Sequence, residues 1–420
     1  MTEFYNQKIE CMPQAEIKQL QLKLFNRQLK RANKAKAYQN KLPQSITDLS
    51  EIKNISFTTK DDLRKSGKFG YLAIPEEEIA RFNSTSGTTG EPVMVYFSKS
   101  DIENIAQRSA RNHFMAGIRK GDILQIISSS NLFIGGWCFS GGSFELGASV
   151  LQTGPGNTKR QIKFLKEMKS KFIFSTSGYF LHLLNSLSND DMKEIALKGA
   201  IIGAEPTSME AKKIVAEKYH LDLYDIYGFT EVGGPFAQDC HFHKGLHVPE
   251  DSFYIEIIDP ESGEVLPDGE YGELVVTPLQ QEAMPLIRYR TRDITRIIPH
   301  ECGCGRTHRL IEPVSHRIDD MMIINGVNIF PSQIEECIYK HLSDTTNYLI
   351  RIKESEGLKK MIIDIETPKD ILADIDKLHI LEDKLIKELK SEIIISPQLN
   401  FIKIGTLPEF QGKAKRVLAE

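Results

Sequence analysis

Short apolar runs bounded by glycine alternate with stretches of helical periodicity through the middle of the chain. The runs that predict buried strands are residues 122–128, 148–151, 172–175 and 200–202. The stretches with helical spacing between and after them are residues 158–171, 178–187 and 208–219. Short buried strands alternating with helices predict an α/β domain with a largely parallel sheet. Ligands of such sheets bind beyond the carboxyl ends of the strands.

The pattern differs on either side of this region. Residues 14–40 predict an amphipathic helix whose basic outer face is solvated, a better reading than membrane or partner binding. Thr59 is a helix cap ahead of acidic first-turn residues, and a further helix covers residues 99–117. From Phe253 onward, alternating apolar positions predict antiparallel hairpins.

After Asp320 the chain reads as a helix, two strands, a helix and a strand. The first helix starts near Pro331, and the second covers residues 371–390. The strands are residues 348–353, 361–366 and 400–404. The predicted fold class is therefore a large N-terminal α/β domain with a β-hairpin subdomain, plus a small mobile α+β C-terminal lid domain. We place the domains at residues 1–318 and 319–420.

Composition narrows the class of protein. A chain of 420 residues exceeds one compact core, and a net charge of −4 gives no reason to expect nucleic-acid or anionic-membrane partners. The N-terminus lacks a signal peptide, and no apolar run approaches a membrane span. Six cysteines without a small-domain framework indicate a reducing, cytoplasmic location. A homodimer is compatible with the sequence.

The segment FNSTSGTTGEPVMVY, residues 82–96, crowds hydroxyls around Gly87 and Gly90. Glycines let successive N–H groups converge on an anion, and hydroxyls add donors for phosphate oxygens. The segment lacks the Gly-Lys-Ser/Thr ending of a Walker loop. Taken alone, it is equally a polar surface loop between two strands.

Five motifs in order over most of the chain resemble those of the adenylate-forming superfamily, which includes acyl-CoA synthetases, adenylation domains and luciferase. They are residues 82–96, YGFTE at 227–231, YRTRD at 289–293, HRIDD at 316–320 and the Gly412-Lys413 pair. Within the superfamily, MPLIRYRTRD, CGCGRTH and DDMMIINGVNIFPSQIE look most like the phenylacetate-CoA ligase branch.

The resemblance implies an acid–thiol ligase that makes an acyl-adenylate from ATP and a carboxylic acid, aryl or arylalkyl in this branch, and passes the acyl group to coenzyme A. The β- and γ-phosphates would be wrapped by Thr85, Ser86, Gly87, Thr88, Thr89 and Gly90. Thr230 would contact the α-phosphate, and Glu231 would hold Mg²⁺. The adenine side would be formed by Gly203, Ala204, Glu205, Pro206, Tyr227 and Gly228.

The same resemblance implies that Asp293 accepts hydrogen bonds from the ribose and that Arg317 is a second contact. The competing interpretation of Asp293 is a surface ion pair among Arg288, Arg290, Arg292 and Arg296. Lys413 would bridge the substrate carboxylate and the α-phosphate as the catalytic lysine of the lid, and Asp319 would be the hinge. From sequence alone a lysine so near the chain end is usually solvated.

Cysteine and histidine also suggest a metal. Cys302-Gly303-Cys304 and a distant Cys240 supply thiolates, and His241, His243 and His247 follow Cys240. Thiolate plus imidazole is a zinc pattern, although separate reduced thiols would give the same spacing. Since the branch often carries Cys…Gly-Leu-His…Cys-x-Cys, we expect a closed structural zinc site of Cys240, His247, Cys302 and Cys304.

Two departures from the branch bear on the substrate. Glu91 stands where lysine is usual, and Ser140-Gly141-Gly142 replaces His-Tyr-Gly in the acyl-pocket region. Phe133, Trp137 and Gly141 would then shape an apolar pocket, although the two rings could equally be core packing. The acceptor is also open, because a carrier-protein thiol or an amine could replace coenzyme A. A catalytically silent nucleotide-binding protein is the remaining alternative.

Overall fold

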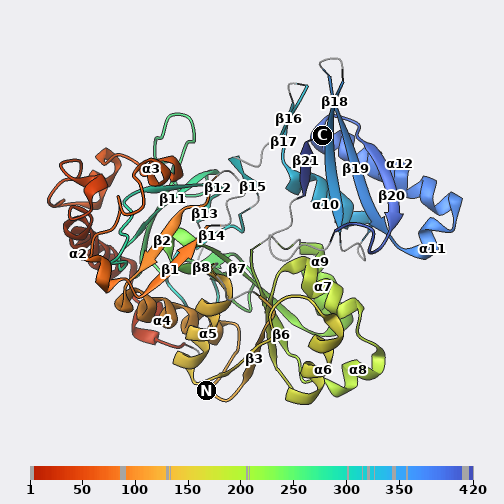
Figure 1. The fold of residues 1–420 in the computed structure, drawn as a ribbon, viewed down its shortest axis with the longest axis horizontal. Helices are drawn as coiled ribbons and strands as arrows, with labels where there is room; N and C mark the ends of the chain where they lie inside the picture. The colour runs from red at the N-terminus through yellow and green to blue at the C-terminus, as the bar shows by residue number, and fades with distance from the viewer. Residues whose placement is uncertain are drawn as a thin grey trace.

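The computed structural model describes most of the chain. The described residues are 4–85, 91–128, 132, 134–204, 207, 209–299, 302–314, 316–318, 322–325, 327–342, 347–355, 358–408 and 416–419. They form two lobes, a larger one up to Arg317 and a smaller one from Met322 onward (Figure 1). Each lobe has its own hydrophobic core, and the smaller one is built around Ile329, Ile363 and Leu385.

A nine-stranded mixed sheet runs through the larger lobe in the order β13-β14-β9-β8-β7-β6-β5-β3-β4. Its parallel half comprises β3 (Ile123–Ile126), β4 (Ser149–Gln152), β5 (Phe172–Ser175), β6 (Gly199–Ile202) and β7 (Asp222–Phe229). Its antiparallel half comprises β8 (Gly234–Asp239), β9 (Leu246–His247), β13 (Ile297–Ile298) and β14 (Leu310–Ile311). The predicted α/β class is confirmed, and β3 to β6 lie where the apolar runs placed them.

Helices cover this sheet. They are α4 (Lys99–Met115), α5 (Gly135–Leu146), α6 (Thr158–Met168), α7 (Ser177–Asn185), α8 (Asn189–Glu194) and α9 (Met209–Tyr219). Helix α5 was not predicted, because four of its twelve residues are glycine, which disfavours a helix. Packing explains it, since a Cβ added to Gly142 would stand 2.3 Å from the Cβ of Ser109 on α4. The glycines allow α4 and α5 to approach closely.

An antiparallel sheet and the N-terminal helices complete the larger lobe. The sheet contains β10 (Phe253–Ile258), β11 (Gly272–Pro278), β12 (Tyr289–Thr295) and β15 (His316–Arg317). Its β10–β11 pair is the antiparallel hairpin that the alternation predicted. The hairpin β1 (Arg81–Ser84) and β2 (Met94–Phe97) flanks the hydroxyl-rich loop. The remaining elements are α1 (Gln7–Glu10), α2 (Gln14–Ala32), α3 (Lys60–Lys65) and the 3₁₀ turns Lys36–Tyr38, Leu49–Asn54, Glu76–Glu78 and Thr230–Val232 (η4).

The predicted helix over residues 14–40 was too long. Helix α2 ends at Ala32 because tertiary bonds take the following chain elsewhere. The Ala37 N–H donates to the Gly70 carbonyl over 2.8 Å, and the Tyr38 hydroxyl accepts from the Ile287 N–H over 2.9 Å.

The smaller lobe has the predicted order with additions. It contains the hairpin β16 (Met322–Ile324) and β17 (Val327–Ile329), α10 (Pro331–His341), β18 (Tyr348–Ser355), β19 (Leu358–Thr367), α11 (Lys369–Leu372), α12 (Ile375–Ile393), β20 (Gln398–Lys403) and β21 (Val417–Ala419). One sheet has the order β20-β19-β18-β21. The single helix predicted over residues 371–390 is instead two helices, because Asp374 caps α12 by accepting from the Lys377 N–H.

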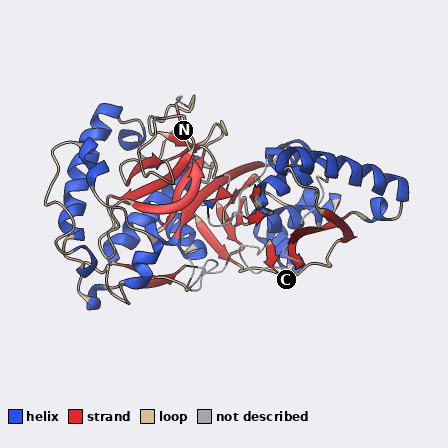
Figure 2. Ribbon diagram, turned by 90° about the horizontal axis from the view of Figure 1, so that it is seen from above, coloured by secondary structure: helices blue, strands red, loops and turns tan. Residues whose placement is uncertain are grey.

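Helices lie on the outside of the sheets in both lobes (Figure 2). Within the described part of the chain, no helix has the length and apolar character needed to cross a membrane.

Candidate functional site

The segments that follow β6 and β7 form one wall of the candidate site. Strand β6 runs into Gly203 and Ala204, and β7 ends at Phe229, just before the η4 turn. Gly228 is required here, because a Cβ would lie 2.3 Å from the Gly234 carbonyl oxygen across the β7–β8 pairing. Ala204 has a φ of +71°, a left-handed conformation uncommon for a residue with a side chain.

Asp293 lies at the centre of a buried polar group. Its carboxylate accepts a short hydrogen bond from the Tyr227 hydroxyl, and an Arg317 guanidinium nitrogen lies 3.3 Å from Oδ1. Register explains the second contact, because Asp293 and Arg317 are directly paired across β12 and β15. Burial, together with Asp293, raises the pKa of Tyr227 well above its ordinary value, so the hydroxyl remains a donor. Three of the predicted nucleotide contacts are thus brought together.

Glu231 is held in a second polar group at η4, where it is 4% exposed. The Tyr289 hydroxyl donates to Oε1 over 2.8 Å, and Lys60 Nζ lies 3.5 Å from the same oxygen. The backbone carbonyl of Glu231 accepts from Gln281 Nε2 over 3.2 Å. Burial, followed by Glu231, raises the pKa of Tyr289 well above its usual value. A carboxylate fixed in this way offers oxygen to a hard cation.

Sequence reasoning missed Lys60 as a site residue and treated its segment as the start of a helix. No local signal could have found it, because it reaches Glu231 through a long-range contact. Thr58 forms an isolated β-bridge with Tyr289, and this backbone pairing places the first turn of α3 beside the site. Tyr289 belongs to the YRTRD motif, but the motif alone assigned it no role.

The neighbouring arginines have other partners. Arg288 donates to Glu256 through two hydrogen bonds of 2.9 Å, and Arg290 donates to Glu273. Arg296 donates to Glu312 over 2.5 Å. Asp293 itself is 3% exposed, so its ion pair with Arg317 is buried and not a surface pair.

Thr230 and Thr85 are predicted phosphate contacts that the structure describes. Thr230 is buried beside Glu231, and the Thr85 hydroxyl accepts from the Val93 N–H over 3.0 Å, which closes the base of the hydroxyl-rich loop. The predicted site residues that lie outside the described part of the chain are Ser86, Gly87, Thr88, Thr89, Gly90, Phe133, Glu205, Pro206, Asp319 and Lys413.

Two residues assigned to the acyl pocket lie on α5. Trp137 is half-buried, with the Arg81 guanidinium 4.4 Å from its ring centroid. Gly141 faces α4, where a Cβ would stand 3.5 Å from the Cβ of Ala106. A role for either residue in acid recognition stays a prediction.

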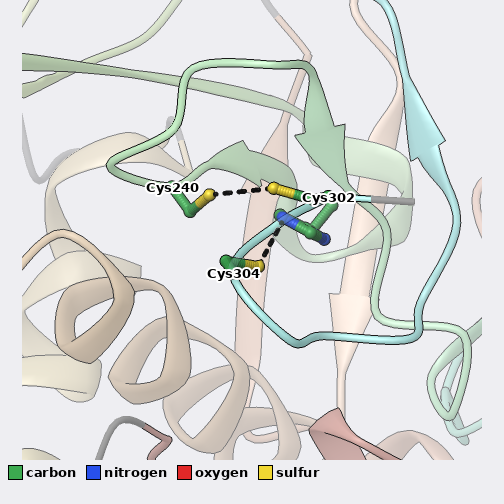
Figure 3. A group of neighbouring side chains, drawn as sticks. Cys240, Cys302 and Cys304 are labelled. Carbon is green, nitrogen blue, oxygen red and sulfur yellow. Dashed lines mark hydrogen bonds between the residues drawn. The ribbon is translucent and has the colours of Figure 1, made fainter. Parts of the chain in front are cut away.

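Cys240, His247, Cys302 and Cys304 converge, as the sequence predicted, with one potential ligand atom from each lying within 4.8 Å of all the others. Figure 3 shows the three cysteines around one imidazole. Cys240 Sγ is 3.6 Å from Cys302 Sγ, and Cys304 Sγ is 3.4 Å from His247 Nε2. Tetrahedral zinc with Zn–S bonds of about 2.3 Å places two sulfurs roughly 3.7 Å apart, so the donor set fits that metal.

Electrostatics in this cluster favour a thiolate. The Cys240 thiol and then His247 hold the pKa of Cys304 far below its ordinary value. The thiolate is the form that binds metal. The cluster joins the β8–β9 loop to the segment between β13 and β14, which continues the chain from the strand of Asp293.

Fold and site together define an adenylate-forming enzyme. Residues 13–280 match the AMP-binding enzyme family, and residues 326–420 match the AMP-binding enzyme C-terminal domain. A phenylacetate-coenzyme A ligase of Pseudomonas putida is 37% identical over 89% of this chain and 86% of its own. That of Aromatoleum evansii is 35% identical over 98% of this chain and 96% of its own.

Solved structures agree in fold. A 2-hydroxyisobutyryl-CoA ligase in the postadenylation state, in complex with 2-HIB-AMP, superposes with a TM-score of 0.91 at 24% identity, covering 100% of this chain and 93% of that one. The same ligase in the thioesterification state, with 2-HIB-AMP and CoA, gives 0.72 at 25% identity over the same shares.

The chain belongs to the phenylacetate-CoA ligase branch of the AMP-binding enzymes. It is accordingly an acid–CoA ligase, which activates a carboxylic acid with ATP through an acyl-adenylate and transfers the acyl group to coenzyme A.

Proposed function

We propose that the substrate is an aryl or arylalkyl carboxylic acid. Its carboxylate oxygen attacks the α-phosphorus of ATP and pyrophosphate leaves; the thiol of coenzyme A then displaces AMP from the acyl-adenylate. The observation that carries this proposal is the 35% identity, over nearly the full length of both chains, to a ligase named for phenylacetate. The replacement of His-Tyr-Gly by Ser140-Gly141-Gly142 argues for a reshaped pocket and hence a relative of phenylacetate.

Polar contacts of the buried side chains support the proposed roles of three nucleotide contacts, Asp293, Arg317 and Tyr227. Asp293 accepts from the ribose hydroxyls, and Arg317 orients it. Tyr227 lies on the adenine side and fixes the Asp293 carboxylate by donating to it. Adenylate formation depends mainly on neutralising charge around phosphates, so preorganised cations and donors matter most.

Glu231 is the proposed Mg²⁺ ligand, and Mg²⁺ supplies charge neutralisation at the phosphates when bound. Tyr289 and Lys60 hold the carboxylate in place. Lys60 also brings a positive charge to the site, on the helix whose Arg64 donates to the Glu91 carbonyl oxygen over 3.1 Å.

Lys413 is proposed to bridge the substrate carboxylate and α-phosphate during adenylation. Asp319 is proposed as the hinge about which the smaller lobe turns before thioester formation, with the domain boundary at residues 318 and 319. These roles rest on the motif resemblance, because both residues lie outside the described part of the chain.

A structural zinc is proposed at Cys240, His247, Cys302 and Cys304. The support is the buried convergence of three sulfurs and one imidazole nitrogen. Four protein donors complete a tetrahedral site, so the metal would stabilise the loops and leave no position for substrate.

The decisive experiment is acid-dependent ATP–pyrophosphate exchange with aryl, arylacetic, fatty and amino acids, followed by addition of CoA and mass analysis of the product. We expect exchange with an aryl or arylacetic acid and a CoA thioester. Exchange without a thioester would assign a carrier-protein thiol or an amine as acceptor. ATP binding without exchange for any acid would support a silent nucleotide-binding protein.

A further inference from the structure

A buried ionic cluster lies beside the nucleotide wall and has no part in the roles assigned above. Lys212 Nζ on α9 lies 2.7 Å from Asp225 Oδ2 and 2.8 Å from Asp239 Oδ2. The side chains of Lys212, Asp225 and Asp239 are 12%, 10% and 2% exposed. His243 Nδ1 lies 2.8 Å from the same oxygen of Asp239.

The cluster connects three segments that lead into functional regions. Lys212 is in the first turn of α9, the helix that follows the proposed adenine-side residues 203–206 in the chain. Asp225 precedes Tyr227 by two residues on β7, and Asp239 immediately precedes Cys240 at the end of β8. Strands β7 and β8 are already joined by their backbone ladder, whereas α9 is tied to both of them by the Lys212 ammonium.

Gly203, the first of the proposed adenine-side residues, lies against the strand that carries Asp225. A Cβ on Gly203 would stand 3.1 Å from Cγ2 of Ile226, the residue between Asp225 and Tyr227. The left-handed Ala204 is a strained backbone position, which persists only where the surroundings hold it.

The ammonium remains charged in this environment. Burial lowers the pKa of Lys212, but Asp225 and Asp239 outweigh burial and raise it above the usual value. The Lys212 ammonium donates a hydrogen bond to Asp239 Oδ2 over 2.8 Å, and its contact with Asp225 Oδ2 is a buried ion pair.

We propose that Lys212 is a positioning residue for nucleotide binding. It fixes the first turn of α9 against β7, close to Gly203, and through Asp239 and His243 it ties that turn to the proposed metal-binding loop. The inference rests on the proposed function, because it assumes that residues 203–206 contact the adenine.

The test compares variants that separate folding from positioning. Lys212→Met alone leaves two buried carboxylates facing each other and is expected to fold poorly. The triple variant Lys212→Met, Asp225→Asn, Asp239→Asn keeps the side-chain sizes and removes the charges, so it should fold. Lys213→Met, an exposed neighbour on the same helix, is the matched control for charge.

We expect the triple variant to raise the KM for ATP about five- to tenfold, with kcat within about twofold, because a lost positioning contact weakens binding before chemistry. The KM for CoA and the bound zinc should match those of the control. ATP affinity by calorimetry should fall in parallel, a readout that stands even if no tested acid is activated. A folded triple variant that binds ATP like the Lys213→Met control would overturn the proposal.

Discussion

The ion pair between Arg288 and Glu256 gives a sharp stability prediction. Both residues are almost fully buried, at 2% and 4% exposure, and two hydrogen bonds of 2.9 Å join them. Arg288 also donates to the carbonyl oxygens of Lys53 and Ile55, over 2.9 and 2.6 Å, and its guanidinium lies 4.0 Å from the Phe57 ring centroid. One guanidinium therefore fastens the N-terminal segment to the sheet of Asp293.

Glu256→Gln keeps the shape but leaves the guanidinium without its counter-charge. Burial raises the pKa of Glu256 even though Arg288 opposes the shift, so desolvation is the larger effect at this pair. Removing one partner of such a pair costs about 3–5 kcal/mol, because the other charge stays buried and uncompensated. We expect the free energy of unfolding of the larger lobe, measured by urea denaturation, to fall by that amount.

The control is Asp190→Asn, which breaks a pair with Lys193 of equal length, 2.9 Å, but 86% and 75% exposed. Solvent screens that pair, so little change is expected. If Glu256→Gln were as mild as Asp190→Asn, the reasoning from burial would be refuted. The variant should also weaken ATP binding, because the fastened segment carries Lys60 to Glu231.

Three further predictions concern the site. Tyr227→Phe removes the donor to Asp293 and should raise the KM for ATP in pyrophosphate exchange about tenfold, since hydrogen bonds to charged groups are worth about 1.5–3 kcal/mol; an unchanged KM would contradict the role. Lys413→Ala should lower adenylation by about 10²–10³ while thioester formation from supplied acyl-adenylate survives, and equal loss of both half-reactions would exclude the assignment. Protein purified without chelator should contain about one zinc per chain and lose it, with a lower Tm, in Cys302→Ser; clearly substoichiometric metal would argue against the site.

Sequence patterns predicted the structure correctly where the residue types within a short segment determine burial or ligand chemistry. The buried strands β3 to β6 were found because residues in a parallel sheet are apolar on both faces. The residue types alone suggested zinc but left His241, His243 and His247 open, and the resemblance to the phenylacetate-CoA ligase branch selected His247, which converges with Cys240, Cys302 and Cys304.

Other features failed local reasoning for identifiable reasons. Helix α5 was missed because four of its twelve residues are glycine, which disfavours an isolated helix but permits close packing on α4. Helix α2 was overextended because the bonds of Ala37 and Tyr38 that end the helical region reach residues 33 and 249 positions away.

The sequence by itself determined the fold class, the order of the motifs and the residue types available for phosphate, ribose and metal. Only the tertiary structure decided which carboxylate pairs with which cation: Asp293 with Arg317, Glu231 with Lys60, and Asp225 and Asp239 with Lys212. The physical reason is that strand register and helix packing set these distances. The position of a charged side chain in the sequence does not indicate which partner folding will bring within hydrogen-bonding range.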